Sequence, residues 1–267
     1  MSGGTERPSE LGSTYDDHFY ADLDAEVRGS AETVVPIVVD LLHPASVLDV
    51  GCGRGTWLHV FAQCGVGEIL GLDGPHIAAA DLEIPPGAFV GHDLTQPFDL
   101  GRRFDLVVSL EVAEHLPPHS AAAFVASLVA HAPAVLFSAA VPFQGGAGHV
   151  NERWPSYWAE LFAAHGFDPV DVVRPAVWAD ERVAFWYAQN TLLYVARSHA
   201  GADLVRERSA TVRGPLDLVH PLLHERDHAA RRRPSPPPSL RRALRDVRAA
   251  ALRAVRDRAS ARGGRSS

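Results

Sequence analysis

The stretch VLDVGCGRGTWL, residues 47–58, sets Gly51, Gly53 and Gly55 within five positions, directly behind a short apolar run. Glycine tolerates positive φ angles and lets the backbone approach another group closely. The apolar run predicts a strand buried on both faces of a parallel sheet, and the residues after Gly55 predict a helix. In open parallel sheets, a strand, a glycine turn and a helix often bind a nucleotide; the alternative is a tight turn without a ligand.

The rest of the chain repeats this alternation of strand and helix. Strands are expected at residues 46–50, 68–72, 87–91, 104–110, 134–141, 169–173 and 191–196. Helices are expected at residues 30–42, where Ser30 would be the cap, and at 56–65, 120–132 and 155–167. This spacing predicts an α/β fold with a doubly wound, mostly parallel sheet and helices on both faces.

Composition divides the chain into three parts. Residues 1–15 predict a disordered leader, residues 16–230 one domain, and residues 231–267 a Pro/Arg-rich linker followed by a basic helix or disordered tail. The tail holds twelve Arg against two Asp, so it carries +10 of the total charge of −7, and residues 1–230 carry −17. An acidic body argues against a nucleic-acid substrate, because phosphate backbones require a basic footprint. The tail is either solvated or docks on an acidic surface, such as anionic lipid or the chain's own body.

The sequence also predicts where the protein works. No window reaches the roughly 18 apolar residues that indicate a membrane span, and the N-terminus lacks the apolar core of a secretory signal. Cys52 and Cys64 are the only cysteines, which fits a reducing cytoplasm. We therefore expect a cytoplasmic protein with a small-molecule partner, and no feature indicates its oligomeric state.

Three aspartates lie near the ends of the first expected strands. Asp73 follows the glycine loop by roughly 20 residues, the position from which an acid binds ribose hydroxyls. Asp93, in GHDL, is placed to receive an adenine amino group. Asp49 directly precedes the glycine turn and would repel a pyrophosphate, and the third glycine comes one residue earlier than in the dinucleotide fingerprint. Asp49 instead suits a ligand that carries an ammonium and a sulfonium group.

These motifs resemble those of S-adenosylmethionine-dependent methyltransferases of the Rossmann-like class, over residues 30–196. VLDVGCGRG is similar to the first motif of that family, LGLDG to the second, GHDL to the third and FDLVVSLEVAEHLP to the fourth. The stretch FSAAVPFQGGAGHVNERWPSYW, with FWYAQN further on, is similar to a bacterial subset that acts on small molecules in sugar and natural-product pathways.

The resemblance implies S-adenosylmethionine as cofactor and a set of residues around it. In that set the three glycines admit the methionine part, Asp73 binds the ribose, and Asp93 or its neighbour Leu94 meets the adenine. The full set is Asp49, Gly51, Cys52, Gly53, Gly55, Asp73, Gly74, Asp93, Leu94 and Leu110.

Two acids and a histidine follow the fourth expected strand, in SLEVAEHLP. Methyl transfer is an in-line displacement, so alignment supplies much of the rate, and a hydroxyl acceptor must also lose its proton. Glu111 and His115 are four residues apart and would share one face of a helical turn, where the carboxylate can orient the imidazole. The alternative is a surface turn in which Glu114 caps the backbone and His115 packs under Pro117.

The loop after the fifth expected strand carries a second polar group, GHVNE. Long loops on a rigid sheet often bind substrate. We expect His149 to contact the acceptor as the base, with His115 shaping the site or relaying the proton, and Asn151 and Glu152 orienting the substrate. The alternative is a loop whose polar groups satisfy its own backbone.

Aromatic residues near this loop are candidates for an acceptor wall. The candidates are Trp154, Tyr157, Trp158, Trp186 and Tyr187, and the alternative for each is a place in the core. Of these, Trp154 and Tyr157 are predicted to bind the acceptor. His115, His149 and Glu152 would offer metal ligands, but their spacing does not demand an ion. We therefore predict no metal.

The predicted function is methyl transfer to a hydroxyl of a sugar, glycoside or natural product. Transfer to nitrogen or to a carboxylate is one alternative. A nicotinamide-dependent oxidoreductase or epimerase on a similar sheet is another, which the missing G-x-G-x-x-G motif and Asp49 disfavour. A non-catalytic donor-binding protein whose Arg-rich tail is the working part is a third.

Overall fold

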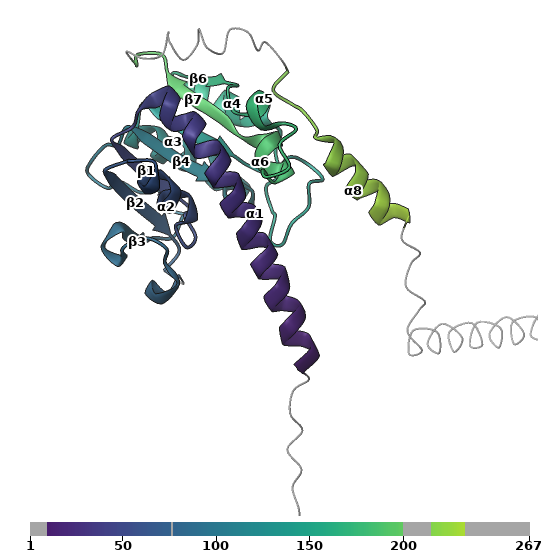
Figure 1. Cartoon of the computed structure of the whole chain (residues 1–267). Coiled ribbons are helices and arrows are strands. Elements are labelled where there is room, and N and C mark those ends of the chain that lie inside the picture. Colours follow the sequence, from purple (N-terminus) through teal and green to yellow (C-terminus); the bar gives the residue numbers. More distant parts are fainter. Residues whose placement is uncertain (1–9, 76, 200–214, 233–267) are drawn as a thin grey trace, which may run out of the picture. The chain divides into compact units, whose positions relative to one another are not determined.

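The computed structural model describes residues 10–75, 77–199 and 215–232 of the chain. Among these residues, seven strands form one sheet in the order β3-β2-β1-β4-β5-β7-β6 (Figure 1). The strands are β1 (Ser46–Val50), β2 (Glu68–Asp73), β3 (Phe89–Gly91), β4 (Leu106–Leu110), β5 (Ala134–Ser138), β6 (Phe167–Val170) and β7 (Leu192–Ala196).

Five neighbouring strands, from β3 to β5 in this order, pair in parallel, and β7 runs antiparallel to both β5 and β6. In the centre of the sheet, Leu48 of β1 pairs with Leu70 of β2 and with Val107 of β4. The predicted doubly wound, mostly parallel sheet is therefore confirmed. It differs from the dinucleotide-binding order 3-2-1-4-5-6 by the antiparallel β7 between β5 and β6.

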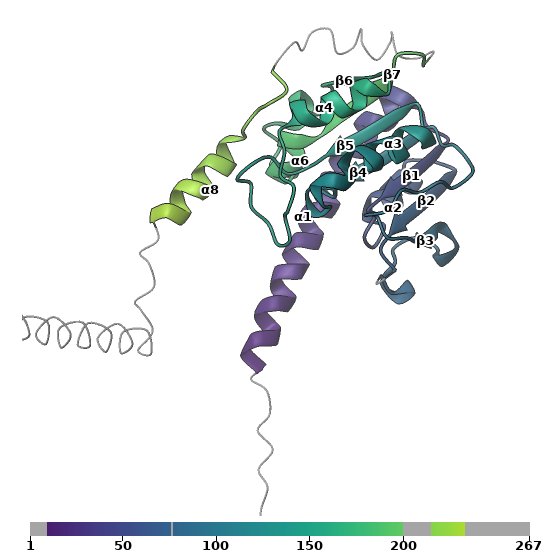
Figure 2. The ribbon, with the colours of Figure 1, turned by 180° about the vertical axis from the view of Figure 1, so that it is seen from behind.

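Helices cover both faces of the sheet. They are α1 (Glu10–Leu42), α2 (Thr56–Gln63), α3 (Ala121–His131), α4 (Pro155–Ala164), α5 (Arg174–Val177), α6 (Phe185–Asn190) and α8 (Pro221–Arg232). Short 3-10 turns are η1 (Ala79–Asp81), η2 (Pro86–Ala88), η3 (Ala113–His115) and η4 (Pro118–Ser120). Figure 1 shows α1 and α2 on one face, and Figure 2 shows α3 and α4 on the other.

The core explains why β1 carries apolar side chains on both of its faces. Val47 packs into the cluster under α1 and α2, whereas its neighbour Leu48 packs into the cluster under α3 and α4. Both side chains are fully buried, because a strand inside a parallel sheet has no solvent face.

The first helix is longer than predicted. It begins at Glu10, inside the range predicted as a disordered leader, and residues 1–9 lie outside the described residues. Ser30 is not its cap, because the hydroxyl donates to the Glu26 carbonyl one turn earlier, at 2.6 Å, and accepts the Ala184 N–H. Ser30 therefore ties the middle of α1 to the start of α6.

The C-terminal part can be compared with the prediction only in part. His224 is the last residue of the first compact unit, and the predicted tail lies outside the described residues from residue 233 on. None of the helices in the described ranges combines the length and hydropathy that crossing a membrane requires.

Candidate active site

A cavity of about 710 Å³ lies at the carboxyl ends of β1, β2 and β4, a volume within the range of small-molecule sites. Its wall consists of Gly51, Asp73, Gly74, Pro75, Asp93, Leu94, Thr95, Glu111, Val112, His115 and Leu116. Seven of these were predicted as site residues from the sequence, whereas Pro75, Thr95, Val112 and Leu116 were not. Among the residues predicted to bind the cofactor, those outside the wall are Asp49, Cys52, Gly53, Gly55 and Leu110.

The glycine turn brings its backbone up against Val112. Gly51 has φ 82° and donates its N–H to the Leu72 carbonyl at 2.7 Å. A Cβ at Gly51 would lie 2.3 Å from a methyl carbon of Val112, which lines the cavity. Only glycine therefore fits here without moving that wall.

Substituting Gly51 by Ala should destabilise the fold more than the same change at Gly53. Both positions have positive φ, 82° and 53°, which costs an L-residue about 1–2 kcal/mol. Only Gly51→Ala would also displace Val112, at a further cost of about 1–3 kcal/mol, because nothing lies within 4 Å of a Cβ at Gly53. Urea unfolding of the two variants measures the difference, and equal destabilisation would show that the Val112 contact is relieved at no cost.

Asp73 connects the glycine turn to the end of β2. Its Oδ2 accepts the Gly53 N–H and its Oδ1 accepts the Gly74 N–H, both at 2.6 Å. The carboxylate is half-buried and borders the cavity. Each oxygen has a further lone pair, so the two can also accept hydroxyl donors from a ligand.

Asp49 and Cys52 lie beneath the turn rather than in the cavity wall. Asp49 is buried and its Oδ2 has no hydrogen-bond partner in the described chain. Burial, and then the charge of Asp73, raise the pKa of this carboxyl well above its ordinary value. Burial likewise raises the pKa of the Cys52 thiol, so Cys52 is a packing residue and not a nucleophile.

The segment after β3 closes another side of the cavity. Asp93 is exposed, and its Oδ1 accepts the Thr95 hydroxyl at 2.7 Å and the Thr95 N–H at 3.0 Å. These hydrogen bonds lower the pKa of Asp93. Leu94 is buried and lines the cavity, whereas Leu110, at the end of β4, is buried behind it. An apolar side chain and a carboxylate therefore follow each other in this part of the cavity wall.

Glu111 is held by amides and not by a histidine. It has φ 55°, and its two carboxylate oxygens accept from Asn190 Nδ2 at 3.0 Å and from Gln144 Nε2 at 2.8 Å. Burial raises the pKa of Glu111, although these hydrogen bonds oppose the rise. The expected Glu111–His115 contact on one helical face is not found in the described chain, because the backbone turns at Glu111 and His115 belongs to the 3-10 turn η3.

Two histidines from different segments meet at the cavity. The rings of His115, which lines the cavity, and His149, from the loop after β5, lie 4.9 Å apart at 85°. His149 Nδ1 contacts Glu152 Oε1 at 3.0 Å, so a carboxylate orients the ring of His149, whereas the carboxylate partner expected for His115 is not found among the described residues. Burial, and then the charge of His149, lower the pKa of His115.

The other predicted acceptor residues take different positions. Asn151 is buried, donates to the Ala113 carbonyl at 3.4 Å and accepts from Arg153. Trp154 is exposed, and Tyr157 is half-buried with the Arg153 guanidinium 5.3 Å from its ring centre. Of the other three aromatic candidates, Trp158 and Tyr187 are buried core residues and Trp186 is partly buried against the core.

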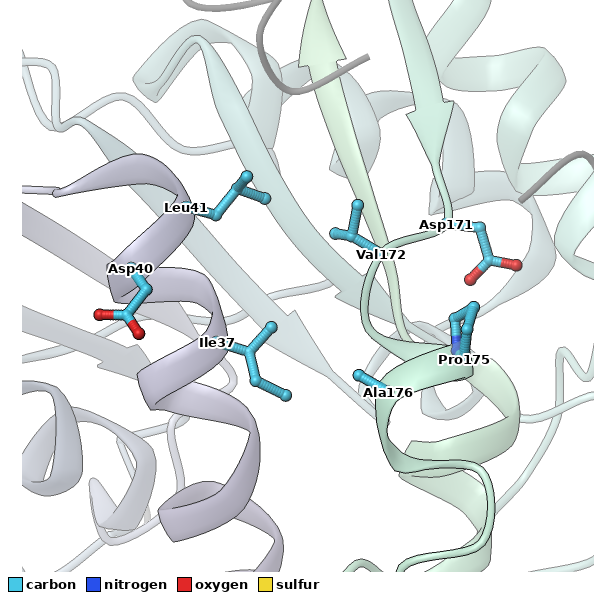
Figure 3. Close-up of a pocket in the computed structure, with 7 residues that line it drawn as sticks. All are labelled: Ile37, Asp40, Leu41, Asp171, Val172, Pro175 and Ala176. Carbon is cyan, nitrogen blue, oxygen red and sulfur yellow. The ribbon is translucent and has the colours of Figure 1, made fainter. Parts of the chain in front are cut away.

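A second cavity, of about 520 Å³, lies between α1 and the segment after β6. Figure 3 shows Ile37 and Leu41 of α1 on one side, opposite Val172 and Ala176. Of its two acids, Asp171 is paired with Arg174. The cavity shares no lining residue with the first, and no polar groups converge on it as a binding site requires.

Comparison with known proteins agrees with the fold. Residues 31–172, just over half of the chain, match the family described as methyltransferase domain. No curated protein matches the chain by sequence. DesVI of Streptomyces venezuelae is 18% identical, with a TM-score of 0.52 over 71% of this chain and 100% of that one. The sugar N-methyltransferase KedS8 from Streptoalloteichus sp ATCC 53650 is 20% identical, with a TM-score of 0.50 over 74% and 98%.

The sheet has the Rossmann-like α/β fold of these solved structures. The chain belongs to the family of methyltransferase domains, and its cofactor is S-adenosylmethionine. The residues present fit S-adenosylmethionine, since Gly51 leaves room beside Val112 and Asp73 presents a carboxylate to the cavity.

Proposed function

We propose that the chain methylates a hydroxyl group of a sugar, a glycoside or another natural product. Bound S-adenosylmethionine supplies a methyl carbon made electrophilic by the sulfonium sulfur. The main support for the proposal is the pair of histidines at the cavity. His115 lines the cavity, and the ring centres of His115 and His149 are 4.9 Å apart. A hydroxyl acceptor needs a group that takes its proton beside the donor, and imidazole is the most frequent such group.

The surroundings give the two histidines different parts. The Glu152 carboxylate, 3.0 Å from His149 Nδ1, orients the imidazole that would take the proton. The lowered pKa of His115 keeps that ring neutral, so it can pass a proton on or donate one hydrogen bond. We therefore assign the base to His149 and the shaping of the site to His115.

The acceptor is expected to be partly apolar. The loop that carries His149 also exposes Phe143 and Val150, 89% and 59% of their surfaces, with Trp154 at 36%. Together with Tyr157 these side chains would cover an apolar part of an acceptor, and Asn151 and Glu152 would hold the loop that presents them. The charge of −17 on residues 1–230 disfavours nucleic acid, and we infer a cytoplasmic small-molecule enzyme.

An amine is the second candidate acceptor. It is supported by the likeness to KedS8, whose name states that it is a sugar N-methyltransferase. The same likeness supports a sugar as the acceptor. The Glu152-held His149 favours oxygen over nitrogen, because a neutral amine can attack without first losing a proton.

Labelled methyl transfer distinguishes these acceptors. The full chain is incubated with donor labelled in the methyl group and with matched panels of hydroxylated glycosides, amino sugars and sugar acids. We expect transfer to hydroxyls that survives mild base, which hydrolyses methyl esters. Label found only on amines, or only as base-labile ester, would contradict the proposal.

A further inference from the structure

Three potential metal ligands converge beside the donor cavity. Glu114 and His115 come from the turn after β4, and His149 comes from the loop after β5. One ligand atom of each lies within 4.8 Å of those of the other two. The two imidazoles and one carboxylate thus come from segments more than 30 residues apart in the chain, which the fold brings together.

Backbone hydrogen bonds fix the two segments to each other. The N–H groups of Val150 and Asn151 both donate to the Glu114 carbonyl, at 2.8 and 3.0 Å. The side chain of Asn151 also reaches the Ala113 carbonyl. The residues that directly follow His149 are therefore tied to the turn that carries Glu114 and His115, and the cluster is preorganised without a ligand.

The Glu114 carboxyl is buried and poorly satisfied. Neither of its oxygens forms a hydrogen bond of good geometry with a described residue, although the Glu111 carboxyl and the backbone at Glu114 and Ala140 lie close enough to act on its pKa. A poorly satisfied buried carboxyl is costly and calls for an explanation. A cation in contact with Glu114 supplies a partner.

A further carboxylate supports the cluster from outside. Glu152 Oε1 lies 3.0 Å from His149 Nδ1, and the remaining contacts of Glu152 are with the N–H groups of Phe143 and Gly145. In a metal-binding histidine, the N–H of the second ring nitrogen usually donates a hydrogen bond to such a carboxylate. This bond fixes the tautomer and raises the basicity of the ligand nitrogen.

We propose that Glu114, His115 and His149 bind a divalent first-row transition-metal ion such as Mn²⁺, Co²⁺ or Zn²⁺. Imidazole suits Zn²⁺ and its transition-metal neighbours and the Glu114 carboxylate suits Mn²⁺, whereas Mg²⁺ and Ca²⁺ are bound through oxygen ligands. Three protein ligands leave coordination positions open to an acceptor. This site replaces the sequence prediction of no metal, and Glu114 takes the place of Glu152 in the ligand set considered there.

The role of the ion rests on the proposed hydroxyl acceptor. A coordinated hydroxyl has a lowered pKa, so its O–H bond breaks and the proton passes to solvent. The oxygen electron pair forms the new bond to the methyl carbon, and the carbon–sulfur electron pair stays on sulfur, which leaves S-adenosylhomocysteine. In the ion-bound enzyme His149 acts as a ligand, and the ion takes over the part assigned above to His149 as base.

Direct binding tests the site without any need for turnover. Full-length, tag-free protein is stripped with EDTA, dialysed and titrated with Mn²⁺, followed by calorimetry and by the electron paramagnetic resonance of free Mn²⁺. We expect one site per chain in the wild type, binding at least tenfold weaker in Glu114→Gln and in His149→Gln, and binding about 10–100-fold weaker in Glu152→Gln. His165→Gln, an exposed histidine that ends α4, is the matched control and should bind as wild type.

Several outcomes would overturn the site. One is that the wild type shows no saturable binding of Mn²⁺, Co²⁺ or Zn²⁺. Another is unchanged binding in a Glu114→Gln protein that has a wild-type circular dichroism spectrum. A third is that the wild type binds Mg²⁺ more tightly than Mn²⁺. Turnover with excess EDTA separates the two proposals. Full activity of the metal-free enzyme in excess EDTA would show that the ion has no part in the reaction and that His149 acts as the base. Ion binding without methylation of any hydroxyl supports the site and contradicts the proposed acceptor.

Discussion

The His149→Gln variant should turn over about 10²–10⁴ times more slowly than the wild type, the usual contribution of a positioned acid or base. Glutamine retains the size and hydrogen-bonding capacity of the side chain but cannot take a proton near neutral pH. Affinity for S-adenosylhomocysteine should stay nearly unchanged, because His149 does not line the donor cavity. The measurements are kcat with the best acceptor of the labelled screen and Kd by calorimetry.

Two further variants, a control and a His115 substitution, are needed to interpret the turnover of His149→Gln. His165→Gln, far along the chain at the end of α4, should keep full turnover. If His149→Gln keeps full turnover while His115→Gln loses it, the parts of the two histidines are reversed. If both variants keep full turnover, the acceptor needs no proton removal. The acceptor would then be a carboxylate or a neutral amine, and the assignment of a hydroxyl would be wrong.

Asp73→Ala should weaken donor binding at least tenfold. Two charge-assisted hydrogen bonds to the ribose, each contributing about 1.5–3 kcal/mol, would be lost. The change also removes the carboxylate that accepts the Gly53 and Gly74 N–H groups, so the turn under the donor loses two backbone contacts. Calorimetry with S-adenosylhomocysteine measures the loss.

The comparison for this variant is an exposed carboxylate outside the cavity. Glu160→Ala, on α4, should bind the donor as wild type does. Asp93→Ala should have a smaller effect than Asp73→Ala, because Asp93 is exposed to water. Wild-type affinity in an Asp73→Ala protein that unfolds cooperatively would show that the ribose binds elsewhere.

The sheet could be predicted because its signals are local. β1 carries apolar side chains on both faces since both faces are buried, and glycines at positive φ mark the turn into α2. The start of α1 was missed because Ser30 resembles a helix cap in sequence, whereas its hydroxyl bonds the Glu26 carbonyl inside a longer helix. Such back-bonding cannot be distinguished from capping in the sequence.

The site was less predictable because its contacts join distant segments. Asp73 followed from its spacing to the glycine loop, a local rule. Glu111, by contrast, is bound by Gln144 and by Asn190, which lies 79 residues away. Glu111 also has a positive φ, which a helical turn with His115 would not allow. The FWYAQN stretch was noted in the sequence, but nothing in it indicates that its amide faces a carboxylate.

The environment of Glu114 also could not be predicted from the sequence. Its sequence position suits a capping residue, and only the fold buries both of its oxygens, without hydrogen bonds of good geometry, next to two histidines. Burial, and then the charge of Glu111, raise the pKa of Glu114 to about 9. Burial of this degree depends on the loop after β5, whose conformation no pattern in the sequence specifies.

A crystal structure of the full chain with S-adenosylhomocysteine tests the central claim most directly. We predict the ribose hydroxyls within hydrogen-bond distance of Asp73, the homocysteine part beside Gly51, and the sulfur on the side of the cavity that His115 lines. The position of a transferred methyl group would then face the His115–His149 pair. A ligand whose sulfur points away from this pair, or whose adenine occupies the space next to His115, would contradict the assignment of both the donor site and the base.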